Sequence, residues 1–441
     1  MNPLAVELNE TIRKANPHVF DMLSTLGREM YFPKGILAQS AEAKAKAKKF
    51  NATLGVATEA GHMMYLPSLM KQLSGQTPDE VLNYAPVTGV PELRAAWKAK
   101  VLRDNPTLAA QRKPISPPIV TSGLTHGLSI MADLFCEPGD ALILPDQIWG
   151  NYRLTFGVRR GAQISTFPFY GEKGGFNVAG FRAALDKVRA AKSKVIVLLN
   201  FPNNPTGYSV TVPDGRELAS ALLAAAEAGL NVVAIVDDAY YGLFYEPDVM
   251  TESLFSLIAG GHKRLLAVKC DAATKEVFVW GLRVGFLSFS VGGAPEESPL
   301  YAALEKKVSG QIRGVMSNCS MLSQRVVLKA LQSSSFFDER SAKKDVLRAR
   351  ADEVKRVLAD KKFSAAWEPY PFNSGYFMCL RLKKLPAETL RRHLLEKYGV
   401  GTIATGEHDL RIAFSCVEKE NIRGLFDTIY EAAREMPETR D

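Results

Sequence analysis

The feature that most constrains the fold is a series of seven short apolar runs between residues 117 and 290. Each run has the length and the β-branched content of a buried strand. Several of the intervening stretches, such as FRAALDKVRAAK and GRELASALLAAAEAG, have helical periodicity. This alternation predicts an α/β domain with a mostly parallel sheet covered on both faces. The predicted strands are residues 117–121, 141–144, 163–167, 195–200, 231–237, 265–269 and 284–290.

The C-terminal part has a different pattern, typical of a smaller α+β unit. A long charged helical segment begins at Phe336, and two strand-like runs (375–382 and 409–415) alternate with helices around Leu390 and Ile422. A chain of 441 residues is too long for one minimal core, so two domains are expected. We predict a large domain over residues 65–340 and a small domain built from residues 1–64 and 341–441.

Composition excludes several classes of protein. No apolar run approaches the ~20 residues of a membrane span, and the N-terminus lacks a signal-peptide core. The five cysteines are scattered without a CxxC pair, which argues against disulfides and a zinc site. The lysine-rich stretch 41–50 has no interleaved aromatic residues, so it indicates a solvated helix face and no nucleic-acid partner. We therefore expect a cytoplasmic protein without membrane contact.

Polar residues follow several predicted strands, at the edge where open α/β sheets bind ligands. Gly123, Leu124 and Thr125 turn the chain into a helix, whose N-terminus can cradle a phosphate, although such a turn is commonly only a turn. Asn204 lies in FPNNPTG, which is either loop punctuation or a source of amide donors. Asp237 ends a strongly apolar strand, and a buried carboxylate there needs a cationic partner.

Two further cations lie in the apolar stretch DAATKEVFVWGLRVGF, residues 271–286. Burial of Lys275 and Arg283 is costly unless each meets an anion or loses its charge. Pyridoxal phosphate, a phosphorylated aromatic aldehyde, would satisfy all these groups. Its phosphate would bind Arg283 and the helix N-terminus, Asp237 would pair with the protonated ring nitrogen, and Lys275 would form an imine.

The order of these motifs resembles one family. NNPTG (203–207), DDAYYG (237–242), Lys275 and an arginine eight residues later occur as in the class I aminotransferases of the fold-type I pyridoxal-phosphate enzymes. Aspartate and aromatic aminotransferases are the most similar members. The similarity runs from about Asn51 to Arg411, nearly the whole functional length.

The resemblance implies roles for the catalytic and substrate-binding residues. Lys275 would hold the cofactor and move the proton between the substrate Cα and the cofactor C4′. Asp237 would keep the pyridine nitrogen protonated, while Asn204 and Tyr240 would hydrogen-bond the phenolic oxygen. Arg411, in DLRIAFS, would clamp the substrate α-carboxylate by a two-point contact.

The resemblance also implies contacts around the rest of the cofactor and across a homodimer. Trp149 would stack on the ring, Gly55 would lie where the N-terminal segment closes over substrate, and Tyr84 would reach the phosphate of the partner subunit. Ordinary packing remains an alternative for Trp149 and for Tyr84. The phosphate would be held by Gly123, Leu124, Thr125 and Arg283.

Three positions mark departures or open questions. Ala272 stands where the family usually has serine or glycine, so a hydroxyl to the phosphate would be missing, and Phe278 is bulkier than usual. These changes predict an intact but atypical phosphate cup. Arg313 matches by spacing the arginine that binds the side-chain carboxylate of dicarboxylic substrates from the partner subunit, or it is an ordinary surface arginine.

The predicted function is pyridoxal-phosphate-dependent transfer of an amino group from an L-amino acid, aspartate or aromatic, to a 2-oxo acid such as 2-oxoglutarate. A β-eliminating lyase on the same scaffold is the alternative. A cofactor-sensing regulator would need a DNA-binding domain, and the ~50 residues before Asn51 are too few for one. A catalytically inactive homologue conflicts with the presence of Lys275, Asp237 and Arg411.

Overall fold

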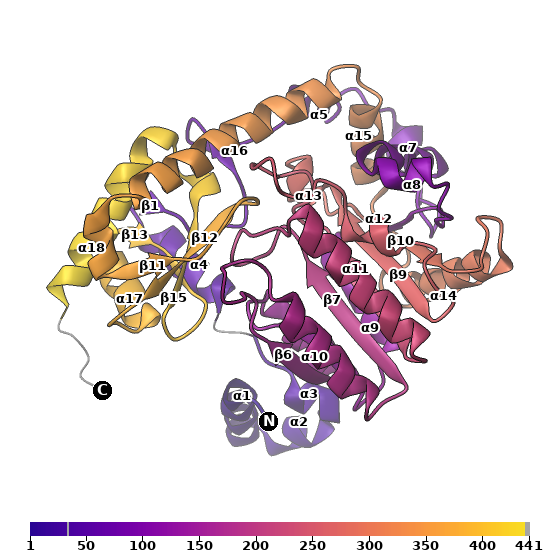
Figure 1. Ribbon diagram of the computed structural model, residues 1–441, viewed down its shortest axis with the longest axis horizontal. Coiled ribbons are helices and arrows are strands. Elements are labelled where there is room, and N and C mark those ends of the chain that lie inside the picture. The colour runs from indigo at the N-terminus through magenta and orange to yellow at the C-terminus, as the bar shows by residue number, and fades with distance from the viewer. Residues whose placement is uncertain (33–34, 437–441) are drawn as a thin grey trace.

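The computed structural model describes residues 1–32 and 35–436, and its centre is a seven-stranded sheet. The strand order is β4-β10-β9-β8-β7-β5-β6 (Figure 1). All seven predicted strands are confirmed, with boundaries that shift by no more than three residues. The strands are β4 (Ile119–Thr121), β5 (Ala141–Pro145), β6 (Gln163–Phe167), β7 (Lys194–Asn200), β8 (Asn231–Asp237), β9 (Leu265–Ala272) and β10 (Gly285–Val291).

The sheet is parallel except at one strand. β6, β5, β7, β8 and β9 pair in parallel, whereas β10 runs antiparallel to both β9 and β4. β8 is buried along its length except at its first residue, as expected for a strand covered on both faces. Helices α10 (Val178–Arg189) and α11 (Val212–Glu227) lie against the sheet in Figure 1. The carboxyl ends of β7, β8 and β9 therefore meet at one edge of the sheet.

A second, four-stranded antiparallel sheet has the order β11-β12-β15-β14. α18 (Ile422–Glu435) buries Ile422, Leu425, Phe426 and Ile429, an i, i+3, i+4, i+7 stripe that packs on this unit. A short parallel pair joins β1 (Phe50–Asn51) to β13 (Val400–Gly401), so the N-terminal segment lies beside the C-terminal unit. The remaining elements of this unit are β11 (Trp367–Pro369), β12 (Phe377–Leu382), β14 (Ile403–Ala404), β15 (Asp409–Ala413) and α17 (Ala387–Tyr398).

The long charged helix predicted from Phe336 is α16 (Phe336–Leu358), which runs along one side of the molecule, from α15 (Met321–Leu331) to the C-terminal unit (Figure 1). Arg340 in its first turns pairs with Asp104 of α7 (Pro91–Asp104), and the helix packs on α18, η3 (Phe414–Cys416) and η4 (Lys419–Asn421). Helices α2 (Pro17–Met22) and α3 (Thr25–Glu29) pack on α1 (Pro3–Ala15), and the guanidinium groups of Arg13 and Arg28 lie 4.0 and 4.6 Å from the centre of the Phe20 ring. Within residues 1–32 and 35–436, no helix combines the length and apolar character that crossing a membrane requires.

The other elements complete the framework. The N-terminal ones are α1 (Pro3–Ala15), α2 (Pro17–Met22), α3 (Thr25–Glu29), α4 (Ile36–Lys46), β2 (Thr58–Glu59), β3 (His62–Met63), α5 (Pro67–Met70), α6 (Pro78–Val81), α7 (Pro91–Asp104) and α8 (Pro106–Ala110). The later ones are α9 (Leu124–Phe135), η1 (Arg153–Val158), α12 (Leu254–Ile258), α13 (Ala273–Glu276), α14 (Pro299–Met316), α15 (Met321–Leu331), η2 (Lys361–Ala365), η3 (Phe414–Cys416) and η4 (Lys419–Asn421).

Candidate active site

A cavity of about 230 Å³ opens at the carboxyl ends of β7 and β8. It collects side chains from segments that are more than 300 residues apart in the chain. Its lining residues are Ile36, Gly55, Leu124, Thr125, Trp149, Tyr152, Asn200, Asn204, Asp237, Ala239, Tyr240, Thr274, Lys275, Arg283, Phe377 and Arg411.

Asp237 is the last residue of β8 and is fully buried. The hydroxyl of Tyr152 donates to its Oδ2 at 2.7 Å, and Asn200 and the backbone N–H of Ala239 donate to its Oδ1 at 3.2 and 3.0 Å. Burial raises the pKa of Asp237, while these donors and Lys275 oppose the rise. These hydrogen bonds hold the carboxylate in one orientation, but they do not fully compensate its negative charge. A carboxylate of this kind can pair with a cationic ring nitrogen.

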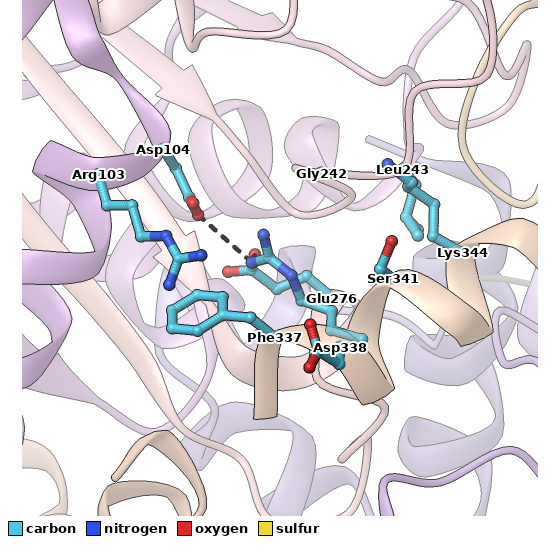
Figure 2. A pocket seen from close by; sticks show the side chains of 10 residues that line it. Arg103, Asp104, Gly242, Leu243, Glu276, Phe337, Asp338, Ser341 and Lys344 are labelled. Carbon is cyan, nitrogen blue, oxygen red and sulfur yellow. Dashed lines mark hydrogen bonds and ion pairs between the residues drawn. The ribbon is translucent and has the colours of Figure 1, made fainter. Parts of the chain in front are cut away.

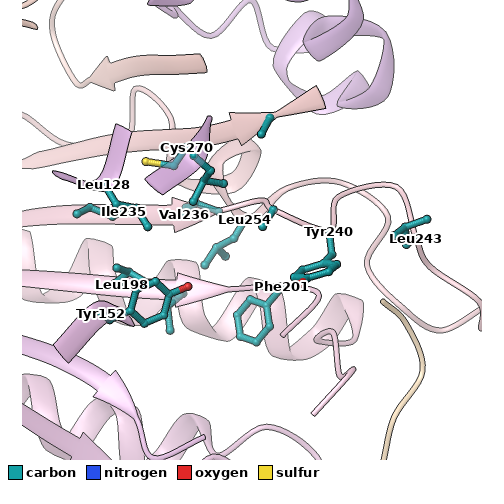
Figure 3. Close-up of a cluster of buried hydrophobic side chains, with 14 of the residues drawn as sticks. Leu128, Tyr152, Leu198, Phe201, Ile235, Val236, Tyr240, Leu243, Leu254 and Cys270 are labelled. Carbon is teal, nitrogen blue, oxygen red and sulfur yellow. The ribbon is translucent and has the colours of Figure 1, made fainter. Parts of the chain in front are cut away.

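Apolar residues behind Asp237 fix the strand end. Figure 3 shows Leu198 of β7 and Ile235 and Val236 of β8 packed in one cluster with the ring of Tyr152 beside them. Close packing of this kind leaves little freedom for the backbone that carries Asp237. Tyr152 was missed by sequence reasoning because it follows a loop, and only the fold brings its hydroxyl to Asp237.

Lys275 lies in α13, directly after β9, and is half-buried. Its Nζ lies 4.7 Å from the centre of the Tyr240 ring, and its carbonyl accepts a hydrogen bond from the hydroxyl of Tyr376 at 2.9 Å. Burial lowers the pKa of Lys275 to about 8, although Asp237 opposes the shift. A sizeable neutral fraction is then present near neutral pH, which a nucleophilic or proton-accepting amine requires.

This pKa predicts how the protein without cofactor reacts with added pyridoxal phosphate. The neutral amine is the reactive form, so the rate of covalent attachment should rise about tenfold per pH unit below pH 8 and level off above it. Stopped-flow absorption from pH 6 to pH 10 measures this rate. A midpoint near 10.5, the ordinary value for lysine, would contradict the effect of burial.

The start of α9 forms a cradle suited to an anion. No side chain caps the helix, and Arg283 lies so close to Gly123 that a Cβ there would collide with the guanidinium group. A Cβ on Gly285 would come within 2.6 Å of the Gly123 carbonyl carbon and 2.9 Å of the Leu124 nitrogen. Glycine at both positions lets the guanidinium lie against the free N–H groups of the first turn. Positive charge from two sources then converges on one small volume.

The backbone of Arg283, whose side chain lies at this cradle, has a strained conformation. Arg283 has φ +54°, a left-handed conformation that costs a residue with a side chain about 1–2 kcal/mol. Phe278 has φ +58° in the same connection, so the unusual residue noted in the sequence occupies a strained and buried position. Such strain persists where the surrounding structure fixes it, commonly at ligand sites.

The missing serine at Ala272 is offset by a threonine two residues later. Ala272 ends β9 without a hydroxyl, as expected. Thr274, however, lines the cavity, and its buried Oγ1 has no hydrogen-bond partner among the described residues. A buried hydroxyl of this kind requires an acceptor, and a phosphate oxygen would supply it.

Arg411 joins the two sheets at the cavity. Its guanidinium group is buried and donates to Asn204 Oδ1 at 3.0 Å and to the carbonyl of Thr53 at 2.8 Å. It also lies 4.2 Å from the centre of the Phe377 ring, and its Nε has no partner among the described residues. A buried guanidinium with a remaining donor is suited to a planar carboxylate.

The other predicted site residues divide into two groups. Gly55 and Trp149 line the cavity, and the Trp149 ring meets Tyr152 edge-on at 5.6 Å. Tyr84, with 82% of its surface exposed, and the exposed Arg313 lie away from this cavity on the same chain. Arg313 donates to the hydroxyl of Ser317 at 2.5 Å.

Comparison with known proteins identifies the family. The family model for class I and II aminotransferases matches residues 47–429. The chain belongs to the class I and II aminotransferases. The predictions of aminotransferase activity and of pyridoxal phosphate as cofactor are therefore confirmed. The orphan hydroxyl of Thr274, the glycine cradle and the pair of Asp237 and Lys275 fit that cofactor.

Relatives of this aminotransferase include enzymes named for aspartate. A probable aspartate/prephenate aminotransferase of Aquifex aeolicus is 25% identical over 358 residues, 78% of this chain and 82% of the relative. Mitochondrial aspartate aminotransferase of Schizosaccharomyces pombe is 23% identical over 87% of this chain and 84% of its own. The aminotransferase of Anaerococcus prevotii has a similar structure, with a TM-score of 0.81 and 23% identity over 93% of this chain and 99% of its own. Aspartate aminotransferase of Thermus thermophilus with maleate gives 0.71 and 20% identity over the same shares. These likenesses confirm the predicted α/β fold.

Proposed function

We propose that this aminotransferase takes its nitrogen from an L-amino acid, aspartate or an aromatic one, and delivers it to a 2-oxo acid such as 2-oxoglutarate. The observation that carries the proposal is the buried Arg411, whose unpartnered Nε lies in the same cavity as Lys275. A guanidinium there selects for an α-carboxylate, which amino acids have and simple amines lack. The names of relatives that include aspartate support aspartate as the donor.

The residues that would hold the cofactor follow from the donor set of the cavity. Arg283, the hydroxyl of Thr274 and the N–H groups at the start of α9 would bind the phosphate, while Asp237 would face the ring nitrogen. When bound, pyridoxal phosphate supplies a ring that accepts the electron pair left at the substrate Cα. Trp149 would cover one face of that ring.

The side chains of this protein then have separate tasks. Lys275, with its pKa of about 8, would remove the proton from the substrate Cα and deliver it to the cofactor C4′. Asp237 would hold the proton on the ring nitrogen. Burial raises the pKa of Tyr240, so its hydroxyl stays protonated and would donate, with Asn204, to the ring oxygen. Ile36 and Phe377 add apolar surface that excludes water.

A half-reaction tests transamination against β-elimination. Purified yellow protein is mixed with L-aspartate, L-phenylalanine or L-cysteine and no acceptor, and the cofactor and products are quantified. L-Cysteine is included because its thiol can leave from Cβ, as β-elimination requires. We expect one equivalent of oxo acid per chain from L-aspartate or L-phenylalanine, with the cofactor converted to pyridoxamine phosphate. Release of ammonia, sulfide and pyruvate from L-cysteine with an unchanged cofactor, and no oxo acid from the other two donors, would contradict the proposal and establish the lyase alternative.

We further propose that the chain acts as a homodimer in the cytoplasm, with Tyr84 reaching the partner's phosphate site. Its exposed ring, beside the exposed Leu82, supports a contact outside this chain. Arg313 would bind the side-chain carboxylate of a dicarboxylic substrate in the partner subunit. The division into residues 65–340 and residues 1–64 with 341–441 is part of the same proposal, supported by the β1–β13 pair.

The role of Arg313 predicts a substrate-dependent effect. Arg313→Ala should raise KM for aspartate about 30-fold or more and leave KM for phenylalanine within about twofold, because only aspartate carries a second carboxylate. Steady-state kinetics with both donors measure the difference. Arg325→Ala, which removes a partly exposed arginine from the next helix, is the control. Equal effects of Arg313→Ala on both donors would contradict the role.

A further inference from the structure

A second cavity of about 310 Å³ lies next to the catalytic lysine in sequence but outside the active site. Lys275 lines the active-site cavity, whereas its neighbour Glu276 lines the second one. Figure 2 shows Arg103 and Asp104 of α7, Glu276 of α13 and the first turns of α16 around this space. It is lined by Arg103, Asp104, Gly242, Leu243, Glu276, Phe337, Asp338, Arg340, Ser341 and Lys344.

Four of the charges at this cavity cancel one another. Lys100 Nζ lies 2.8 Å from Glu276 and 2.9 Å from Asp104, and Arg340 Nη1 lies 3.2 and 3.3 Å from the same two carboxylates. Glu276 uses only its Oε2 in these contacts. Two cations and two anions make a neutral group, so they leave no surplus charge for a ligand.

The other oxygen of Glu276 has no partner. Oε1 is buried and accepts no hydrogen bond from the described residues, and the Glu276 side chain is only 2% exposed. An unpaired buried carboxylate oxygen is costly, so such atoms ordinarily meet a donor. The cavity it borders can admit that donor, and an ammonium group is the strongest kind.

Two further cations line the cavity, Arg103 and Lys344. Among the described residues, no carboxylate forms an ion pair with either of them, and Asp345 only partly offsets the charge of Lys344. Arg103 stacks on the Phe337 ring at 3.4 Å, and burial with the nearby Arg348 lowers the pKa of Lys344. The exposed Asp338 on the rim offsets one positive charge, which leaves a net positive surface for a carboxylate.

We propose that this cavity binds an α-amino acid as a non-substrate ligand, with its ammonium group on Glu276 Oε1 and its carboxylate attracted by the positive charges of Arg103 and Lys344, which lie on opposite sides of the cavity in Figure 2. The volume is at the lower end of the range for small-molecule sites. A neighbouring cavity of about 470 Å³ shares Asp104, Gly242, Arg340 and Lys344, which gives room for the ligand's side chain.

This ligand would regulate the enzyme through α13. Glu276 and Lys275 are consecutive residues of a single helical turn. A ligand that binds the Glu276 carboxylate and shifts it would therefore also shift the backbone that carries the Lys275 amine. The proposal does not depend on which amino acid is the substrate, because the second cavity shares no lining residue with the active site.

The experiment uses the holoenzyme in its pyridoxamine phosphate form, with which amino acids cannot condense. Each of the standard L-amino acids is titrated by calorimetry. Acetate, ethylamine and inorganic phosphate serve as comparison ligands, because each carries only a negative or only a positive charge, whereas an amino acid carries both. We expect at least one amino acid to bind, and Lys344→Ala and Glu276→Gln each to weaken it about tenfold or more. Lys343→Ala, whose side chain pairs with Glu59, is the matched control on α16.

Arg411→Lys separates the two sites, because it alters the active site alone. Unchanged binding in this variant supports the second site. Three results would overturn the proposal: no amino acid binds, Arg411→Lys weakens binding while Lys344→Ala does not, or acetate or phosphate binds as tightly as any amino acid. Lys344 is partly exposed and has no ion pair to lose, so its variant tests the site even where Glu276→Gln disturbs folding.

Discussion

Lys275→Ala is expected to lower the turnover number by about 10⁴-fold, with the fold intact. The variant loses the amine that would hold the cofactor and would move the proton at the substrate Cα. The lysine is half-buried in α13, just after β9, with no ion pair among the described residues, so its removal leaves no buried counter-charge apart from Asp237. Steady-state rates measure the loss of turnover, the visible absorption of the cofactor measures the loss of its attachment, and circular dichroism measures whether the fold is intact.

The control for Lys275→Ala is Lys263→Ala, an exposed lysine shortly before β9. It should retain wild-type turnover and the wild-type absorption spectrum. Cofactor bound to Lys275→Ala should dissociate on dialysis against an amine-free buffer more readily than from the wild type. Activity of Lys275→Ala within tenfold of the wild type would remove this residue from the mechanism.

Asp237→Asn should reduce the turnover number by about 10³-fold, because a neutral amide no longer holds a proton on the ring nitrogen. The amide keeps the size of the side chain. Its oxygen can still accept from Asn200 and from the Ala239 N–H, and its NH2 group can donate to the Tyr152 hydroxyl, so the fold and cofactor binding should persist. Comparing the rates with α-protiated and α-deuterated substrate shows which step limits the variant. A full kinetic isotope effect is expected, since proton removal becomes rate-limiting.

Tyr152→Phe provides a graded comparison for Asp237→Asn. It removes one hydrogen bond of 2.7 Å to Asp237 and leaves the charge, so a loss of about 3- to 10-fold in turnover is expected. The pKa of Asp237 should rise further, because the lost donor favours the ionised carboxyl. A larger loss in Tyr152→Phe than in Asp237→Asn would show that the hydroxyl, and not the carboxylate, is the important group.

The sheet and the residues at its edge could be predicted because they follow from local sequence patterns. Each buried strand is a short apolar run, and in parallel strands the polar residue that ends such a run lies at a common edge. Asp237 was found in this way, and Asn200 could have been, since it ends the neighbouring strand and pairs with Asp237 in register. The resemblance to a family supplied Arg411, which no periodicity marks.

Other parts of the site depend on packing between distant segments. Thr274 is one of many threonines in the sequence, and its importance comes from a buried hydroxyl without a partner. Tyr152 and Glu276 are likewise ordinary residues until the fold places one against Asp237 and the other against Lys100. The strained φ of Arg283 also has no sequence signal, because arginine has no preference for that conformation.

The hydrogen bonds of Arg411 have a consequence for engineered fragments. The guanidinium is held by Thr53 near one end of the chain and by Asn204 in the middle, while Arg411 itself comes from near the other end. An excised central piece would keep the lysine, the aspartate and the phosphate cradle, yet it would have nothing to tell an amino acid from a plain amine. In the proposed roles, the groups that react with the cofactor and the arginine that selects the substrate therefore come from different parts of the polypeptide.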